Sequence, residues 1–305
     1  MKKFLTFVLA LSLSGALLTG CARGGRRDDN EIVLLLGMFS EINILMHMAG
    51  HLIEEYTDLS VSFHDPMWTV AAANAIESGE VDLWVNYDGT LLTTILGYDP
   101  SDVPPGELLL YWTRARAQEE RGLTLLDKFG FENTYALAVR QDFAEQHNLR
   151  TISDLVPLAP TLVFGAEHEF FDIEGTMRYI PFNAHYGIEW GNSLSIQIEL
   201  KYAAMEARQI DVTMVYSTDG LNKRFNLHVL EDDRAFFPEY NAMFLTRTTL
   251  FDEFAQTAPN LQEVLAKLDG QISNETMAYL NYLVDGENQR PEYVARQFLI
   301  SIGLL

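Results

Sequence analysis

Ile32–Leu36 reads I-V-L-L-L, a run of apolar residues with no polar side chain in it. A half-exposed strand would alternate apolar and polar residues, so an unbroken apolar run predicts a buried strand of the kind found in parallel sheets. An amphipathic helix is expected directly afterwards, over Ser40–Tyr56, with Ser40 as its N-cap. A buried strand followed at once by such a helix begins a βαβ unit, and the sequence therefore predicts an α/β fold built on a parallel sheet.

The same alternation of short strands and helices continues along the chain. Further strands are expected at Val61–Phe63, Val81–Tyr87, Thr134–Val139, Thr161–Phe164, Val212–Tyr216, Leu227–Leu230 and Asn241–Leu245. Further helices are expected at Thr69–Ser78, which Gly79 ends, and at Leu200–Arg208, Leu261–Leu268, Asn274–Val284 and Pro291–Leu299. A short helix is also expected to begin at Ser153–Leu155. In open sheets of this class, ligands bind beyond the carboxyl ends of the strands.

The charge of the chain restricts its partners. The 305 residues include 43 acidic and 21 basic side chains, a formal net charge of −22. Nucleic acid is a poor partner because its binding requires clustered Lys and Arg, whereas a negative field attracts small cations. The length is sufficient for one large domain or for two lobes with separate cores.

The first twenty residues predict a signal peptide and not part of the fold. Lys2 and Lys3 precede the apolar stretch Phe4–Leu18, which is too short to cross a membrane. The following L-T-G-C, which ends at Cys21, resembles the bacterial lipobox, in which the cysteine is lipidated. We expect a leader over residues 1–20, a flexible tether over 21–30 and a lipid anchor on the outer face of the cell membrane; an ordinary cleaved leader is the alternative.

The usual signatures of enzymes are missing. His47 and His51 have helical spacing, but a metalloprotease helix would carry Glu where Met48 stands. No nucleophile elbow, phosphate-binding loop or dinucleotide fingerprint occurs, and Cys21 is the only cysteine. The acidic run Glu231–Asp233 is more typical of a solvated loop than of a catalytic pair. We therefore expect no enzyme activity, no metal and no cofactor.

Asp82–Thr90, D-L-W-V-N-Y-D-G-T, ends an expected strand with a tyrosine and a carboxylate. Tyr135, Tyr216 and Tyr240 also stand at the ends of expected strands. Tyrosine packs well in many places, so each of them alone would be an ordinary core or rim residue. One interpretation is that their ring faces meet a positively charged ligand; the other is chance.

Several blocks of sequence resemble the substrate-binding lipoproteins of ABC importers for quaternary ammonium osmoprotectants such as glycine betaine, carnitine and choline. The most specific are Phe131–Val139, Ile152–Leu155, Tyr216–Gly220, Val229–Ala242 and Leu280–Asp285, with Leu52–Leu59 and Y-D-G-T in support. The resemblance implies a two-lobed periplasmic-binding-protein fold of type II, with a hinge and a ligand cleft between the lobes. It places lobe I at residues 31–130 and 230–305 and lobe II at 131–229. It also implies a permease and an ATPase as partners.

The resemblance further implies an aromatic cage. Carried over by motif, the cage falls on Tyr87, Tyr135, Tyr216 and Tyr240, and the last Thr of the family's Y-T-G-T, here Thr90, contacts the polar tail of the ligand. A quaternary ammonium has no N–H to donate, so ring faces suit it, at about 1–2 kcal/mol per desolvated ring. Closure of the lobes would bring Tyr135 and Tyr216 against Tyr87 and Tyr240.

Three departures from the family pattern bear on the ligand. Asp88 replaces a Thr of Y-T-G-T, Ile173 stands where many members have Arg, and Gly37 stands where some have Lys. Since an acid is gained and two cations are lost, we expect a choline-like cation to be favoured and count Asp88 among the ligand-binding residues. In the alternative, Thr90 or backbone N–H groups hold a carboxylate. Two rival functions are a sensory receptor of the same fold for another small cation and an extracellular hydrolase.

Overall fold

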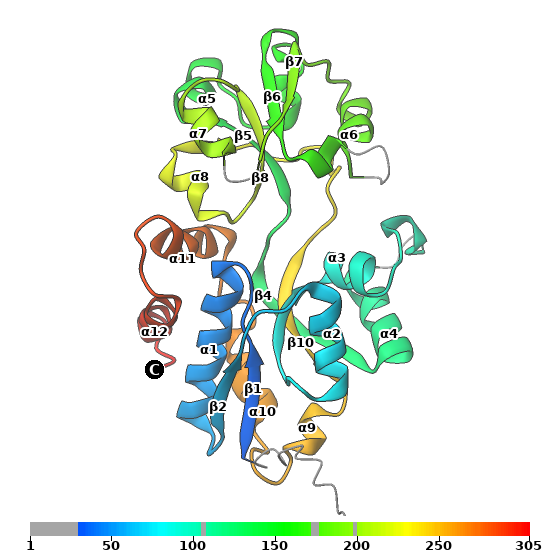
Figure 1. Ribbon diagram of the computed structural model, residues 1–305, viewed down its shortest axis with the longest axis vertical. Helices are drawn as coiled ribbons and strands as arrows, with labels where there is room; N and C mark the ends of the chain where they lie inside the picture. Colours follow the sequence, from blue (N-terminus) through cyan, green and yellow to red (C-terminus); the bar gives the residue numbers. More distant parts are fainter. Residues whose placement is uncertain (1–29, 105–107, 172–176, 198–199) are drawn as a thin grey trace, which may run out of the picture.

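The computed structural model describes residues 30–104, 108–171, 177–197 and 200–305, and they form two lobes joined by two crossing segments (Figure 1). The expected leader and residues 21–29 of the expected tether, with Cys21, lie outside the described residues, and so does Ile173. Among the residues that are described, no helix is both long and apolar enough to cross a membrane.

Lobe I contains both ends of the described chain and two short sheets that meet. Its strands are β1 (Glu31–Leu35), β2 (Ser60–His64), β3 (Trp84–Tyr87), β4 (Leu123–Glu132) and β10 (Asn241–Arg247). Its helices are α1 (Ser40–Tyr56), α2 (Thr69–Ser78), α3 (Asp88–Thr90), α4 (Leu109–Arg121), α9 (Leu250–Glu253), α10 (Leu261–Leu265), α11 (Asn274–Asp285) and α12 (Pro291–Ser301). β1 and β2 are parallel, a parallel bridge between Leu34 and Leu83 joins them to β3, and β10 pairs antiparallel with both β3 and β4.

Lobe II is the middle of the chain and is built on one sheet. Its strands are β5 (Tyr135–Arg140), β6 (Val163–Ala166), β7 (Asn192–Ser195), β8 (Val212–Tyr216) and β9 (Leu227–Val229). Its helices are α5 (Gln141–His147), α6 (Tyr179–Tyr186), α7 (Lys201–Glu206) and α8 (Gly220–Arg224). The strand order is β7-β6-β8-β5-β9, with β6 parallel to its neighbours and β5 antiparallel to β8 and β9.

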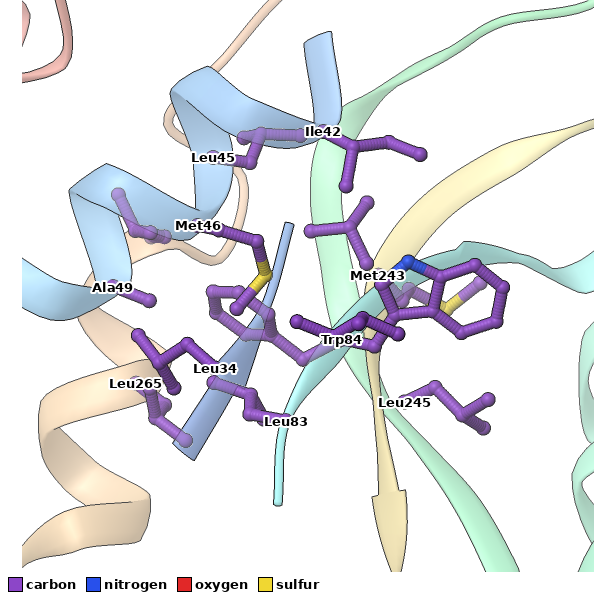
Figure 2. Close-up of a cluster of buried hydrophobic side chains, with 14 of the residues drawn as sticks. Leu34, Ile42, Leu45, Met46, Ala49, Leu83, Trp84, Met243, Leu245 and Leu265 are labelled. Atoms are coloured by element: carbon purple, nitrogen blue, oxygen red, sulfur yellow. The ribbon is translucent and has the colours of Figure 1, made fainter. Parts of the chain in front are cut away.

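Each lobe has its own apolar core. In lobe I, α1 packs Leu45 and Met46 over Leu34 and Leu83, as Figure 2 shows. Each such buried side chain contributes on the order of 1.5–3 kcal/mol relative to an exposed one. The two cores divide the chain near the expected lobe boundaries: Phe131 lies in the core of lobe I, and Leu230 and Phe237 lie in that of lobe II.

Local patterns predicted the first elements well. The bounds of α1 and α2 are those expected, and α2 ends at Gly79, which adopts a left-handed conformation with φ 75°. The predicted N-cap was wrong: Phe39 holds the N-cap position, and the Ser40 hydroxyl donates instead to Asp285 of α11.

The expected parallel pairing is present in β1–β2, β6–β7 and β6–β8, but the sheets are mixed. The pairs β3–β10, β10–β4, β5–β8 and β5–β9 are all antiparallel. Antiparallel pairs arise because the chain crosses between the lobes along β4 to β5 and returns along β9 to β10 (Figure 1). The sequence patterns did not predict α4 and β4, although β4 begins the first crossing.

Candidate functional site

A cavity of about 870 Å³ lies between the two lobes. Lobe I contributes to its wall Gly37, Met38, Phe39, Ile42, Met67, Trp68, Thr69 and Trp84, and lobe II contributes Tyr135, Glu167, His168, Phe170, Arg178, Ser195, Ile196, Gln197 and Tyr216. The wall is therefore mostly apolar and aromatic, with a few polar groups. Such a composition is typical of a site for a small organic molecule.

Tyr135 and Tyr216 form the aromatic centre of this cavity. They are direct cross-strand partners on β5 and β8, and both side chains therefore project from the same face of the sheet. Their rings stack with centroids 5.1 Å apart and an angle of 28° between their planes. The pair presents a broad electron-rich surface toward lobe I, of the kind that attracts a cation without N–H groups.

Tyr240 lies beside a second, smaller cavity of about 460 Å³, which shares Tyr135 and Arg178 with the first. Its ring packs directly on the backbone of Gly89: a Cβ at Gly89 would lie 2.6 Å from Tyr240 Cε2. Only glycine permits this close approach, which gives the Gly of Y-D-G-T a structural role. The structure thus places Tyr240 and Tyr135 on one wall.

Tyr87 has a different environment from the other three tyrosines. It ends β3 and donates its hydroxyl hydrogen to Glu41 Oε1 at 2.5 Å. Burial and the Glu41 carboxylate raise the pKa of Tyr87, and Tyr216 lies close enough to add to that shift. Tyr87 lines neither cavity in this arrangement of the lobes.

Asp88 and Thr90 also line neither cavity. The Asp88 carboxylate is 1% exposed and accepts hydrogen bonds from the backbone N–H groups of Gly89 and Asn241, both at 2.9 Å. It accepts a third from the Asn241 side chain at 2.8 Å. In this structure Asp88 therefore joins the end of β3 to the start of β10, and both of its carboxylate oxygens accept hydrogen bonds there.

The sequence patterns gave no indication of several aromatic residues that lobe I contributes to the cavity. Phe39 and Trp68 are 65% and 78% exposed at its mouth, and Trp84 lies deeper, buried against the core (Figure 2). Trp84 stands in the quoted strand and could have been noticed there. Phe39 and Trp68 immediately precede α1 and α2, and exposed aromatic residues at helix starts carry no pattern that distinguishes them.

The cavity wall of lobe II also carries charge. Lys201 is 1% exposed, and its Nζ lies 2.5 Å from Glu167 Oε1 and 5.6 Å from the centroid of the Tyr216 ring. The Glu167 carboxylate thus neutralises this cation where it is buried. Arg178, which precedes α6, lines both cavities.

The residues considered for metal or acid chemistry take part in packing and in hydrogen bonds within the fold. The His47 ring packs on Phe63, with ring centroids 4.6 Å apart. Asp232 of the acidic run accepts hydrogen bonds from the Tyr186 hydroxyl and from the backbone N–H groups of Phe236 and Phe237. Within the described ranges, no cluster of His, Cys, Asp and Glu is arranged to hold a metal ion.

Comparison with known proteins decides the family. The substrate-binding domain of ABC-type glycine betaine transport systems matches residues 30–301. The chain belongs to that family. It is 34% identical to the carnitine transport binding protein OpuCC of Listeria monocytogenes, over 98% of this chain and 96% of that one. It is 29% identical to the glycine-betaine-binding protein of Pseudomonas aeruginosa, over 88% of this chain and 86% of that one.

The fold of this family member agrees with solved structures. A crystal structure of a glycine betaine/carnitine/choline ABC transporter superposes with a TM-score of 0.80 at 30% identity, covering 90% of this chain and 99% of that one. The expected type II periplasmic-binding-protein fold is confirmed. The chain is a solute-binding protein of an ABC transport system, acting outside the cytoplasm with a small ligand and a permease, and not an enzyme.

Proposed function

We propose that this protein captures a quaternary ammonium compound between the tyrosine rings of its cleft and delivers it to an ABC permease for osmoprotectant uptake. The stacked pair of Tyr135 and Tyr216 on the wall of the interlobe cavity carries the proposal. A permanently charged nitrogen surrounded by methyl groups gains apolar contact and attraction to the ring quadrupole from such a surface. The names of the relatives, which specify carnitine and glycine betaine, support the same ligand class.

The energetics are compatible with useful affinity. At about 1–2 kcal/mol per desolvated ring, Tyr135 and Tyr216 together contribute roughly 2–4 kcal/mol. In the proposed bound form Tyr87 and Tyr240 complete the cage when the lobes close, which raises the gross contribution to about 4–8 kcal/mol. A micromolar complex requires about 8 kcal/mol, so contacts to the rest of the ligand are also needed.

The structure weakens the sequence-based preference for choline. That preference depended on an added acid, Asp88, and on two missing cations. The Asp88 oxygens are taken by Gly89 and Asn241, and Arg178 brings a cation to the cleft from a position that no motif indicates. A Lys in place of Gly37 would not fit without displacing Ile42, because a Cβ at Gly37 would lie 2.5 Å from Ile42 Cβ.

Substitution of the stacked tyrosines tests the proposed function. We expect Tyr135→Ala and Tyr216→Ala each to weaken binding of glycine betaine, carnitine or choline by at least ~1 kcal/mol, about fivefold or more in Kd, with the fold intact. Isothermal titration calorimetry measures the affinity and circular dichroism checks the fold. Tyr111→Ala, at an exposed position on α4, is the matched control and should leave Kd unchanged. Unchanged affinity in both cleft variants would rule the cage out.

We further propose that the protein is held at the membrane by a lipid on Cys21, as its lipobox-like sequence indicates. If so, Cys21→Ala should move the protein from the membrane fraction to the soluble extracytoplasmic fraction without changing its affinity for ligand. Fractionation of cells that express either form measures this. A variant that stays in the membrane fraction would contradict a lipid anchor at Cys21.

A further inference from the structure

Arg178 stands at the point where the two cavities of the cleft meet. Its side chain and the Tyr135 ring line both cavities, which makes them neighbours on one wall. The guanidinium is also close enough to Tyr240 to oppose, by its positive charge, the rise that burial causes in the pKa of that tyrosine. Arg178 is thus a cation placed among the residues of the proposed tyrosine cage.

Among the described residues, the Arg178 guanidinium has few hydrogen-bond partners. Nη1 donates to the carbonyl oxygen of Met177 at 3.3 Å, and the half-buried side chain has a buried Nε with no hydrogen-bond partner in the described chain. No carboxylate of the described residues forms an ion pair with it. A charged group at a cavity wall that lacks a counter-ion among these residues costs free energy, and an incoming anion would recover that cost.

Two other charged side chains near the cleft have polar partners within the protein. Lys201 is paired with Glu167, so its charge is already balanced. Asp99, which lines the smaller cavity, accepts hydrogen bonds from the backbone and side chain of Ser101. Arg178 is therefore the best-placed group to bind a negative charge carried by the ligand.

We propose that Arg178 binds the carboxylate of a zwitterionic ligand whose quaternary ammonium group lies on the tyrosine rings, and that it makes the protein selective for such ligands over choline. The planar guanidinium fork matches a carboxylate with two parallel hydrogen bonds. A hydroxyl in place of the carboxylate, as in choline, would leave the arginine unpaired beside a second cation. This inference rests on the function proposed above and adds the residue that sets specificity.

Titration of the purified protein with glycine betaine, carnitine and choline tests the proposal, because the three share a trimethylammonium head. The wild-type protein should bind glycine betaine or carnitine at least about tenfold more tightly than choline. Arg178→Gln should weaken the carboxylate ligands by about tenfold to a hundredfold and leave choline unchanged or tighter. Arg178→Lys keeps the charge but loses the planar guanidinium. Its affinity for the carboxylate ligands should lie between that of the wild type and that of Arg178→Gln.

The outcomes separate this proposal from the function on which it rests. Binding of choline as tight as that of the carboxylate ligands would overturn the role of Arg178 and keep the cage. Equal losses for all three ligands in Arg178→Gln would mean that the residue acts on folding or lobe closure, and would also overturn the proposal. No binding of any quaternary ammonium compound to the wild type would refute both. Arg290→Gln, exposed and outside the cleft, is the control that should bind as wild type.

Discussion

Asp88 shows how a residue next to a ligand-binding motif can serve the fold. Its carboxylate is buried at the joint between β3 and β10, and the burial raises its pKa from 3.8 to about 6 in spite of three hydrogen bonds from Gly89 and Asn241. The ionised form is therefore less favourable in the folded protein than in the unfolded chain. This makes the joint sensitive to mildly acidic pH.

The sign of the effect follows from proton linkage. Because the pKa is higher in the folded state, Asp88 contributes stability that is complete below pH 3.8 and is lost as pH rises through about 6. We expect the unfolding free energy of Asp88→Asn, measured relative to wild type, to rise by up to about 3 kcal/mol between pH 4 and pH 7. Urea denaturation at both pH values measures it, and a pH-independent difference would contradict the raised pKa.

At the scale of single residues, the sequence identifies side chains better than it orients them. The motifs single out Tyr135, Tyr216 and Tyr240, and the structure places all three at the cleft. The direction of Asp88 depends on Asn241, which is 153 positions away along the chain, and no local pattern contains that information. Arg178 was missed for the same reason, since its place in the cleft depends on how α6 packs.

At the scale of elements, the first turn of α1 connects four segments of the chain. Glu41 is 3% exposed, and its Oε1 accepts hydrogen bonds from Tyr87 at 2.5 Å and Asn133 at 3.1 Å. Its Oε2 accepts from Thr218 at 2.6 Å and Asn281 at 2.9 Å. The carboxylate thus ties α1 to the end of β3, to the first crossing, to the loop after β8 in lobe II and to α11.

A close helix contact stands next to this network. Gly220 begins α8 of lobe II, and a Cβ there would lie 2.4 Å from the backbone nitrogen of Tyr282 on α11 of lobe I. The glycine of the Y-S-T-D-G block therefore lets the two lobes approach, and Figure 1 shows α8 above α11. The network and the helix contact together make the side of the cleft near α11 the closely packed side.

We expect Glu41→Gln to lower the unfolding free energy by about 1–3 kcal/mol and to weaken ligand binding. A glutamine amide nitrogen would face two donors of the network, where the carboxylate oxygen accepts from them. Burial raises the pKa of Glu41, and its four hydrogen bonds oppose that rise by stabilising the carboxylate form. Urea denaturation and calorimetry measure the two effects.

Glu54→Gln, exposed on the same helix, is the control and should behave as wild type. If Glu41→Gln kept both stability and affinity, the network would have no role in holding Tyr87 for the ligand.

Helices and strands were predictable where neighbouring residues in the sequence determine them. The apolar spacing and the terminal glycine fixed α2, and the bounds of α1 followed from the same spacing. The antiparallel direction of β10 between β3 and β4 was not predictable, because those strands come from distant parts of the chain and meet only when the lobes form. Ser40 is not the N-cap because the helix already includes it and Phe39 holds the N-cap position, while the Ser40 hydroxyl donates to Asp285 on α11.

At the scale of the whole molecule, the exposed aromatic residues at the mouth of the cleft bear on how ligand is captured. Phe39 and Trp68 belong to lobe I and line the interlobe cavity, yet most of their surface contacts solvent. Apolar surface of this kind is stabilised when it is covered, at about 25 cal/mol per Å² removed from water. Two crossing segments, from β4 to β5 and from β9 to β10, permit a hinge motion that would cover it.

Trp68 therefore offers a direct report of closure. We expect saturating ligand to shift the tryptophan emission to shorter wavelength, because closure would move the Trp68 indole from water into the cleft. Trp68→Phe, which keeps an apolar ring at the cavity wall, should still bind ligand but lose most of the shift, whereas Trp112→Phe, on α4 and lining neither cavity, should keep the shift. Small-angle scattering on the same samples should show a smaller radius of gyration with ligand. Tight binding with an unchanged radius and an unchanged emission spectrum would mean that the lobes do not close on the ligand, and that Tyr87 takes no part in holding it.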